Sequence, residues 1–165
     1  MTRMAVALIV MAGGFGQQSA PASTFHVVLV GGPYKGTYDV TGEPCMAGLQ
    51  KKGSWHATWE TGKEEKGKLA AVLVGYDPTP TVGNGLTASV HFGPPDSQVM
   101  YEILKPAFNV DDRGTTATLT MKGDARATSY EDGSQTNGGS AEITVTCGKI
   151  IRGDPDRAPR RPPLA

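Results

Sequence analysis

Side chains suited to metal or acid–base chemistry are scattered along this chain rather than clustered. The three histidines, His26, His56 and His91, are far apart in the sequence, so a three-histidine metal site would require the fold to bring them together. The simpler interpretation is that they face solvent from separate strands. Because the histidines are scattered, we predict no metal site. Glu60 and Glu102 could meet as a hydrolytic carboxylate pair, which the sequence neither predicts nor excludes.

The sequence also lacks a recognisable nucleophile or cofactor motif. It contains no G-x-S-x-G elbow around a serine. The Gly-rich stretch with Asp132, Ser134 and Asn137 does not follow the D-x-[DN]-x-[DN]-G spacing of a calcium loop, so a hairpin turn is expected there. Without a catalytic constellation we expect a protein that is not an enzyme and that carries no cofactor.

The two cysteines, Cys45 and Cys147, are the only ones in the chain. They lack the close C-x-x-C spacing of a zinc site, and in an oxidising compartment such a pair persists as a disulfide. We predict a bond between them. It would close a loop of about 100 residues, for which the chain-entropy model gives about 4.7 kcal/mol, less any native strain. The alternatives are two buried free thiols or a metal pair.

The first 22 residues are organised like an export signal. Arg3 precedes an apolar run over residues 4–12, and Ala20-Pro21-Ala22 forms an A-x-A cleavage site. The alternatives, a first core strand or a membrane anchor, are weaker because a spanning helix needs roughly 20 apolar residues. We expect cleavage after Ala22, no transmembrane segment in the mature protein, and a secreted, periplasmic or cell-envelope location.

Alternation of apolar and polar residues predicts an all-β fold. The clearest strand is 141–147, where every second residue is apolar. Trp55 and Trp59 fall on one face of another strand, and both are expected to face the core. Further strand patterns cover residues 25–30, 36–41, 69–75, 86–92, 98–104 and 116–130. With no convincing helix and no fixed repeat, we predict a single-domain antiparallel β-sandwich of about eight or nine strands over residues 23–149.

Charge is balanced overall but uneven along the chain. The chain has sixteen basic and sixteen acidic residues, so it has no net positive charge that would attract it to nucleic acid. Residues 150–165 are rich in Arg and Pro, as is typical of a disordered tail. Arg152-Gly153-Asp154 spells an integrin-recognition tripeptide there, although three common residues on a disordered segment are the simpler interpretation. We expect the tail arginines to be attracted weakly to an anionic envelope.

Four short strand-like segments occur in a characteristic order. They are Val40-Thr41-Gly42 with Cys45 soon after, Ala70-Ala71-Val72-Leu73, Leu119-Thr120-Met121-Lys122-Gly123-Asp124-Ala125, and Glu142-Ile143-Thr144-Val145-Thr146-Cys147. Over residues 36–148 this order resembles the mycobacterial lipoprotein-antigen family. The resemblance implies a small, secreted, surface-exposed β-rich domain with an antigenic or adhesive role and no catalytic residues. Family members are anchored through an acylated cysteine just after the signal, and this chain has none before Cys45.

Two functions follow from these patterns. The leading hypothesis is a secreted, non-enzymatic binding or interaction module whose envelope or extracellular partner is unknown. The alternative is a carrier of small hydrophobic ligands with a lipocalin-like β-barrel, because Gly53-Ser54-Trp55 matches the G-x-W that opens such barrels. In a carrier Trp55 and Trp59 would face the ligand. The two or more strands that precede the motif argue against this barrel.

Overall fold

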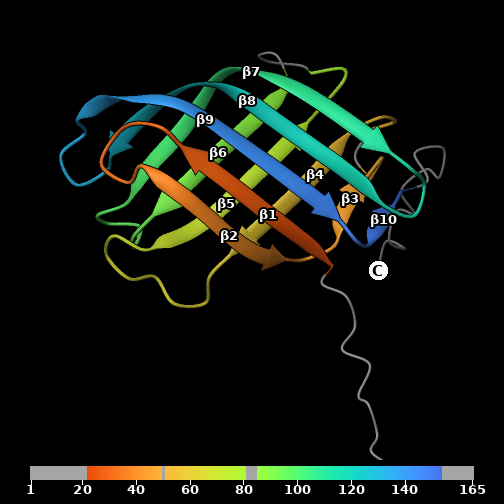
Figure 1. Cartoon of the computed structure of the whole chain (residues 1–165), viewed down its shortest axis with the longest axis horizontal. Coiled ribbons are helices and arrows are strands. Elements are labelled where there is room, and N and C mark those ends of the chain that lie inside the picture. Colours follow the sequence, from red (N-terminus) through yellow and green to blue (C-terminus); the bar gives the residue numbers. More distant parts are fainter. Residues whose placement is uncertain (1–21, 50, 81–84, 154–165) are drawn as a thin grey trace, which may run out of the picture.

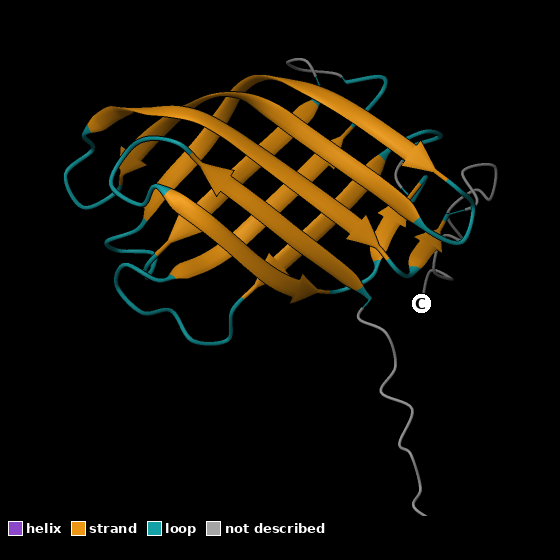
Figure 2. Cartoon of the chain, viewed as in Figure 1, coloured by secondary structure: helices purple, strands orange, loops and turns teal. Residues whose placement is uncertain are grey.

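The computed structural model describes residues 22–49, 51–80 and 85–153, and within these ranges the chain forms ten strands and no helix (Figure 2). The strands are β1 (Ser23–Leu29), β2 (Gly36–Gly42), β3 (Cys45–Ala47), β4 (Trp55–Glu60), β5 (Leu69–Tyr76), β6 (Leu86–Phe92), β7 (Val99–Asp112), β8 (Ala117–Ser129), β9 (Gln135–Cys147) and β10 (Ile150–Arg152). The all-β class is confirmed. The expected signal peptide, apart from Ala22, and residues 154–165 of the expected tail lie outside the described residues.

All ten strands belong to one hydrogen-bonded sheet, in the order β10-β3-β4-β5-β6-β7-β8-β9-β1-β2. Neighbouring strands are antiparallel, except that β10 runs parallel to β3. The sheet curls into a half-barrel, so that β8, β9, β1 and β2 cross over β4, β5 and β6 (Figure 1). The predicted sandwich is not confirmed, because the two crossing layers are halves of one continuous sheet rather than two sheets.

A bulge in β7 accompanies the turn from one layer to the other. Pairing with β8 shifts register between Leu104 and Ala107, and between them Lys105 adopts a φ of 46°. Pro106, which has no N–H to donate, is tolerated at such a bulge. The sequence pattern suggested that the strand ends at this lysine and proline. The strand instead bends there and continues to Asp112.

The concave side of the sheet is filled by every second residue of the strands, as the alternating pattern predicts. The largest fully buried side chains are Tyr101, Phe25, Phe92, Leu119, Met121 and Ile143. Large side chains therefore occupy the interior itself.

Aromatic rings hold the β1–β2 hairpin against the opposite layer. The Phe92 ring stacks on Tyr34 at 4.6 Å between centroids and meets Tyr38 and Tyr101 edge-on at 5.2 and 5.8 Å. The Tyr101 hydroxyl accepts a hydrogen bond from the Tyr34 N–H at 2.8 Å and donates one to the Gly31 carbonyl at 3.2 Å. The hairpin is thus fixed from inside.

The predicted disulfide between Cys45 and Cys147 is confirmed. Both half-cystines are fully buried, and the bond joins β3 to β9 across the two layers. The sheet also continues past this bond, since Ile150–Arg152 form β10 beside β3, where the sequence suggested that a tail begins.

Candidate functional site

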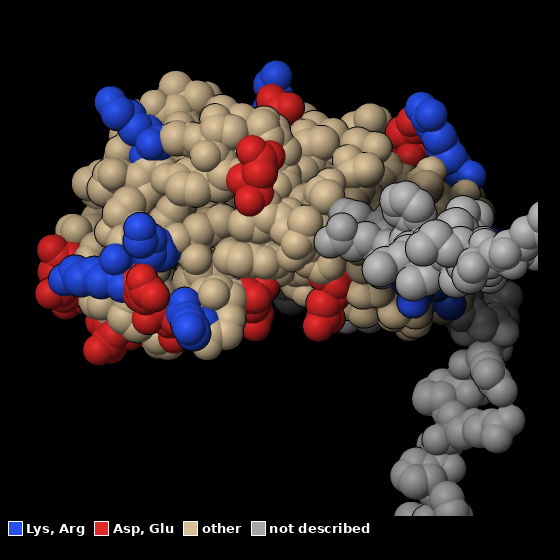
Figure 3. All heavy atoms as spheres, turned by 60° about the horizontal axis from the view of Figure 1, so that its bottom comes forward, with Lys and Arg blue, Asp and Glu red and all other residues tan. Residues whose placement is uncertain are grey.

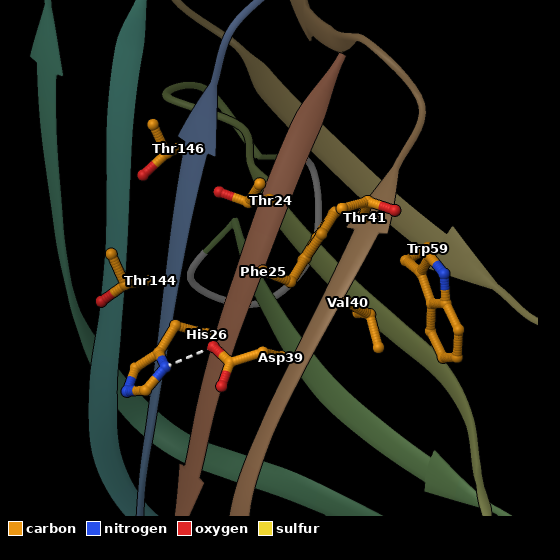
Figure 4. Close-up of a pocket in the computed structure, with 9 residues that line it drawn as sticks. All are labelled: Thr24, Phe25, His26, Asp39, Val40, Thr41, Trp59, Thr144 and Thr146. Carbon is orange, nitrogen blue, oxygen red and sulfur yellow. Dashed lines mark hydrogen bonds and ion pairs between the residues drawn. The ribbon is translucent and has the colours of Figure 1, made fainter. Parts of the chain in front are cut away.

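The curl of the sheet brings β2 and β4 together without pairing them. β2 is the last strand of the sheet and pairs only with β1, while β4 pairs with β3 only through Trp55 and His56. A Cβ added to Gly42 would lie 2.9 Å from the Thr58 carbonyl oxygen, so the strands nearly touch at this end. Away from this point they diverge (Figure 4). We call this gap, bounded by residues 39–43 and 58–60, the seam.

A groove of about 510 Å³ opens at the seam and extends over the outer face of β1 and β9 (Figure 4). Its apolar lining comes from Phe25, which is buried, and from Val40 and Trp59, which are half-buried. The polar lining consists of Thr24, Thr41, Thr144, Thr146, His26 and Asp39. Such a surface could contact a ligand that has both an apolar part and hydrogen-bonding groups.

His26 and Asp39 form the one ion pair among the residues that line this groove. They face each other across the β1–β2 ladder, and the His26 Nδ1 lies 2.7 Å from the Asp39 Oδ1. Both side chains are well exposed, so the pair contributes little to stability. Its effect is to fix the position of the carboxylate on the outer face of β2.

The rim of the seam is acidic. A second groove beside the first is lined by Glu43 and Glu60 together with residues 41, 42, 58 and 59. Glu43, Glu60 and Asp39 are all exposed, and neither groove is lined by a described lysine or arginine. Figure 3, which brings this side of the molecule forward, shows several acidic side chains along its lower margin, with basic side chains among them. The seam therefore carries a local negative charge on a chain whose net charge is zero.

The two tryptophans proposed to face a ligand occupy different places. Trp59 lines both grooves at the seam. Trp55 is only 7% exposed and packs into the core, with the Arg152 guanidinium 5.7 Å from the centre of its ring. It borders a separate groove that also involves Asp112. The alternating sequence pattern placed both tryptophans on one face of the strand. Trp59 lies at an opening because the sheet has a free edge there.

The three histidines lie on three different strands and have different partners. His26 pairs with Asp39, and His56 on β4 lies beside Gly75 of β5. Within the described ranges no group of three or more His, Cys, Asp or Glu side chains is placed to hold a metal ion. Nor does the structure pair the two glutamates considered above, since Glu60 lies at the seam and Glu102 bonds to an arginine of β8.

His91 belongs to a hydrogen-bond network that the sequence analysis missed. Its Nε2 lies 2.9 Å from the Ser89 Oγ and its Nδ1 lies 2.7 Å from the Gln98 Oε1. A hydroxyl, an imidazole and an amide in this order resemble the arrangement around an activated nucleophile. Ser89, however, lies within β6 with only 8% of its surface exposed, which leaves little of it accessible to a substrate. The S-x-H spacing on a strand, which puts both side chains on one face, was the available signal.

The Gly-rich stretch considered for calcium forms the loop and first residues of the β8–β9 hairpin. The Asp132 carboxylate accepts a hydrogen bond from the Ser134 N–H at 3.0 Å, and the Asn137 amide oxygen accepts one from the Gly139 N–H at 2.8 Å. Hydrogen bonds to the Asp132 carboxylate, chiefly the one from the Ser134 backbone, lower its pKa. Here the side chains serve turn geometry.

The arginine of the Arg152-Gly153-Asp154 tripeptide is held within the domain. Its guanidinium donates to both Asp112 carboxylate oxygens, at 3.0 and 2.6 Å, and to the Gly114 carbonyl. This pairing lowers the pKa of Asp112. Asp154 lies outside the described residues. Recognition through the tripeptide would first have to break these bonds.

Within the described part of the chain there is no helix of the length and apolar character needed to cross a membrane. No family model, curated protein or solved structure matches this chain.

Proposed function

We propose that this chain is a secreted, non-enzymatic binding protein of the cell envelope or extracellular space, and that it binds its partner at the seam. One observation carries the proposal: the seam combines unpaired strand edges with a groove in which Trp59 is half-buried. Tryptophan is enriched where proteins bind partners, because its ring offers a large apolar area with one polar group.

The filled interior supports binding at the surface over carriage of a ligand inside. A lipocalin-like carrier needs an open interior for its ligand. Here Tyr101, Phe92, Leu119 and Met121 project into the half-barrel and are at most 1% exposed. The groove beside Trp59 is the feature that most favours a carrier, and it opens at the seam rather than enclosing a ligand.

The proposed location is supported by the disulfide. A bond between Cys45 and Cys147 persists most readily in an oxidising compartment. An antigenic or adhesive role, as the resemblance to the lipoprotein-antigen family implies, is compatible with a protein that binds through its surface. That resemblance stays a prediction.

Two substitutions on one strand test the proposal. Thr41 and Thr37 are both exposed and share the outer face of β2, but only Thr41 lines the grooves. Envelope and extracellular fractions of the source organism would be passed over immobilised wild type, Thr41→Arg and Thr37→Arg. We expect a component that wild type and Thr37→Arg retain and Thr41→Arg does not. If all three proteins retain the same components equally, or if none of them retains any component, binding at the seam is refuted.

A saturable change in tryptophan fluorescence with a panel of fatty acids and other apolar ligands would favour the carrier instead. The change should then depend on the half-buried Trp59, because it lines the groove. We expect no saturable response.

A further inference from the structure

We infer that the partner at the seam is an extended, positively charged polypeptide segment that adds a strand to the free edge of β2. This inference rests on the proposed function and specifies its partner. Three features of the seam carry it: the backbone edge, the side chains of the groove and the charge of the rim.

The backbone edge of β2 is a template for another strand. All seven residues of β2 pair with β1, which keeps the strand extended and in register, while no strand of the described residues pairs with its other side. Proteins often protect such edges with proline or lysine. The described sequence of β2, Gly36–Gly42, contains neither, and its only charged residue is Asp39. Free N–H and C=O groups along such an edge bind extended peptides through main-chain hydrogen bonds.

The opposite wall of the seam also has a free edge. β3 covers only the first two residues of β4, so within the described part of the chain residues 58–60 have no strand partner on the side that faces β2. β2 does not pair with β4 across this gap, and the Tyr38 ring of β2 packs edge-on against Phe92 on the inside. An added strand would therefore enter the gap that β2 and β4 leave between them.

Side chains of the groove suit arginine or lysine on the added strand. Val40 and Trp59 offer apolar contact for the aliphatic part of such a side chain. A cation can also lie over the face of a tryptophan ring, where the electrostatic attraction is strongest. Alternate residues of an added strand would point into the groove, which would give the interaction its sequence preference.

The charge of the rim selects a cationic segment over an anionic one. Asp39 lines the first groove and Glu43 and Glu60 line the second groove beside it, and no lysine or arginine of the described chain lines either one. A complementary charge speeds association and disfavours partners of the wrong sign. An uncharged glycan would gain no charge attraction from this rim.

The probe is a peptide of about ten residues in which arginine and valine alternate, long enough to pair along a typical strand. Binding to the oxidised full-length chain would be measured by titration calorimetry, and hydrogen exchange would be followed at Gly36–Gly42. We expect binding that weakens with salt and slower exchange along β2. A peptide of alternating glutamate and valine should not bind, and replacing the central valines by proline should abolish binding, since proline removes ladder donors.

Matched variants locate the charge effect. The double substitution Glu43→Gln and Glu60→Gln should weaken binding of the arginine peptide about five-fold, as expected for the loss of two exposed ion pairs. Glu64→Gln with Glu65→Gln removes the same charge from an exposed loop that does not line the grooves, and should leave binding unchanged.

Each contrary result removes a part of the inference. Equal binding of the proline peptide would refute strand addition, and equal binding of the glutamate peptide would refute charge selection. If no peptide binds but an envelope component is still lost with Thr41→Arg, the inference fails and the proposed function stands. If the chain dimerises without peptide in sedimentation experiments, and Thr41→Arg prevents this, the occupant is a second copy and the inference is overturned.

Discussion

Replacing Tyr101 by phenylalanine should lower the free energy of unfolding by about 2 kcal/mol, because two partly buried backbone groups lose their partner. The Tyr101 side chain is fully buried, and its hydroxyl bonds to the Tyr34 N–H and the Gly31 carbonyl. The turn is built around this hydroxyl: a Cβ on Gly32 would lie 2.5 Å from the oxygen. The substitution leaves the ring and its contact with Phe92 in place. The loss therefore measures the hydrogen bonds and little else.

The size of this loss depends on how far the Tyr34 N–H and the Gly31 carbonyl are buried once they have lost the hydroxyl. A hydrogen bond contributes about 0.5–1.5 kcal/mol net, and a buried donor or acceptor left without a partner costs about 1–3 kcal/mol. Tyr34 is half-buried and Gly31 lies in a turn, so water can reach part of this site after the change. We therefore expect a value near the middle of that range rather than the sum of two full penalties.

Urea unfolding under oxidising conditions gives the measurement, as a lower midpoint at an unchanged slope. Tyr130→Phe is the control, because this tyrosine is 51% exposed and its hydroxyl contacts only the Met100 sulfur at 3.4 Å. It should change stability by less than about 0.5 kcal/mol. A Tyr101→Phe protein as stable as wild type, or a control that loses as much, would refute the reasoning.

The same substitution should change the response to alkaline pH. Burial raises the pKa of Tyr101, and the hydrogen bond from the Tyr34 backbone offsets this only in part. A group whose pKa is higher in the folded state stabilises the protein below its unfolded pKa of about 10, and this stability is lost as the pH rises through the folded value. Wild type should therefore lose stability more steeply than Tyr101→Phe above pH 10. Tyr38, whose pKa burial also raises, remains in both proteins.

Three further predictions concern other parts of the fold. Reducing the bond between Cys45 and Cys147, or replacing both by alanine, should cost about 2–5 kcal/mol in urea unfolding, and no free thiol should be alkylated in the denatured, unreduced protein. Arg152→Ala should raise the pKa of Asp112 toward its ordinary value, measured by NMR titration. In wild type the lowered pKa adds stability above the unfolded pKa that is lost as the pH falls, and the variant should lose less in acid. Phe92→Ala, at a residue only 1% exposed, should cost about 3–5 kcal/mol; a loss below 1 kcal/mol would mean that the aromatic cluster is not a packed unit.

Much of the local structure could be predicted because it depends on neighbouring residues. The alternation in 141–147 places Ile143, Val145 and Cys147 on the buried face, as found in β9. Turn residues correctly marked the hairpin between β8 and β9. The disulfide followed from the number of cysteines and the expected compartment, which need no knowledge of the fold.

The candidate site was only partly accessible in this way. Trp59 was identified as a residue that could face a ligand, but so was Trp55, which packs into the core. Both belong to one strand and one face, so the local pattern treats them alike. Their difference arises because β3 pairs only with Trp55 and His56, so that the far half of β4 pairs with β5 on one side and with no described strand on the other.

Local sequence patterns were enough to predict the all-β class, the buried face of the strand over residues 141–147 and the covalent link between Cys45 and Cys147. The tertiary structure alone decided that the strands form one curled sheet and that the seam lies between β2 and β4. The reason is that a period of two residues is the same in a sandwich and in a curled sheet. The closure depends instead on the bend of β7 at Lys105 and on the order in which distant strands pair, which no local pattern records.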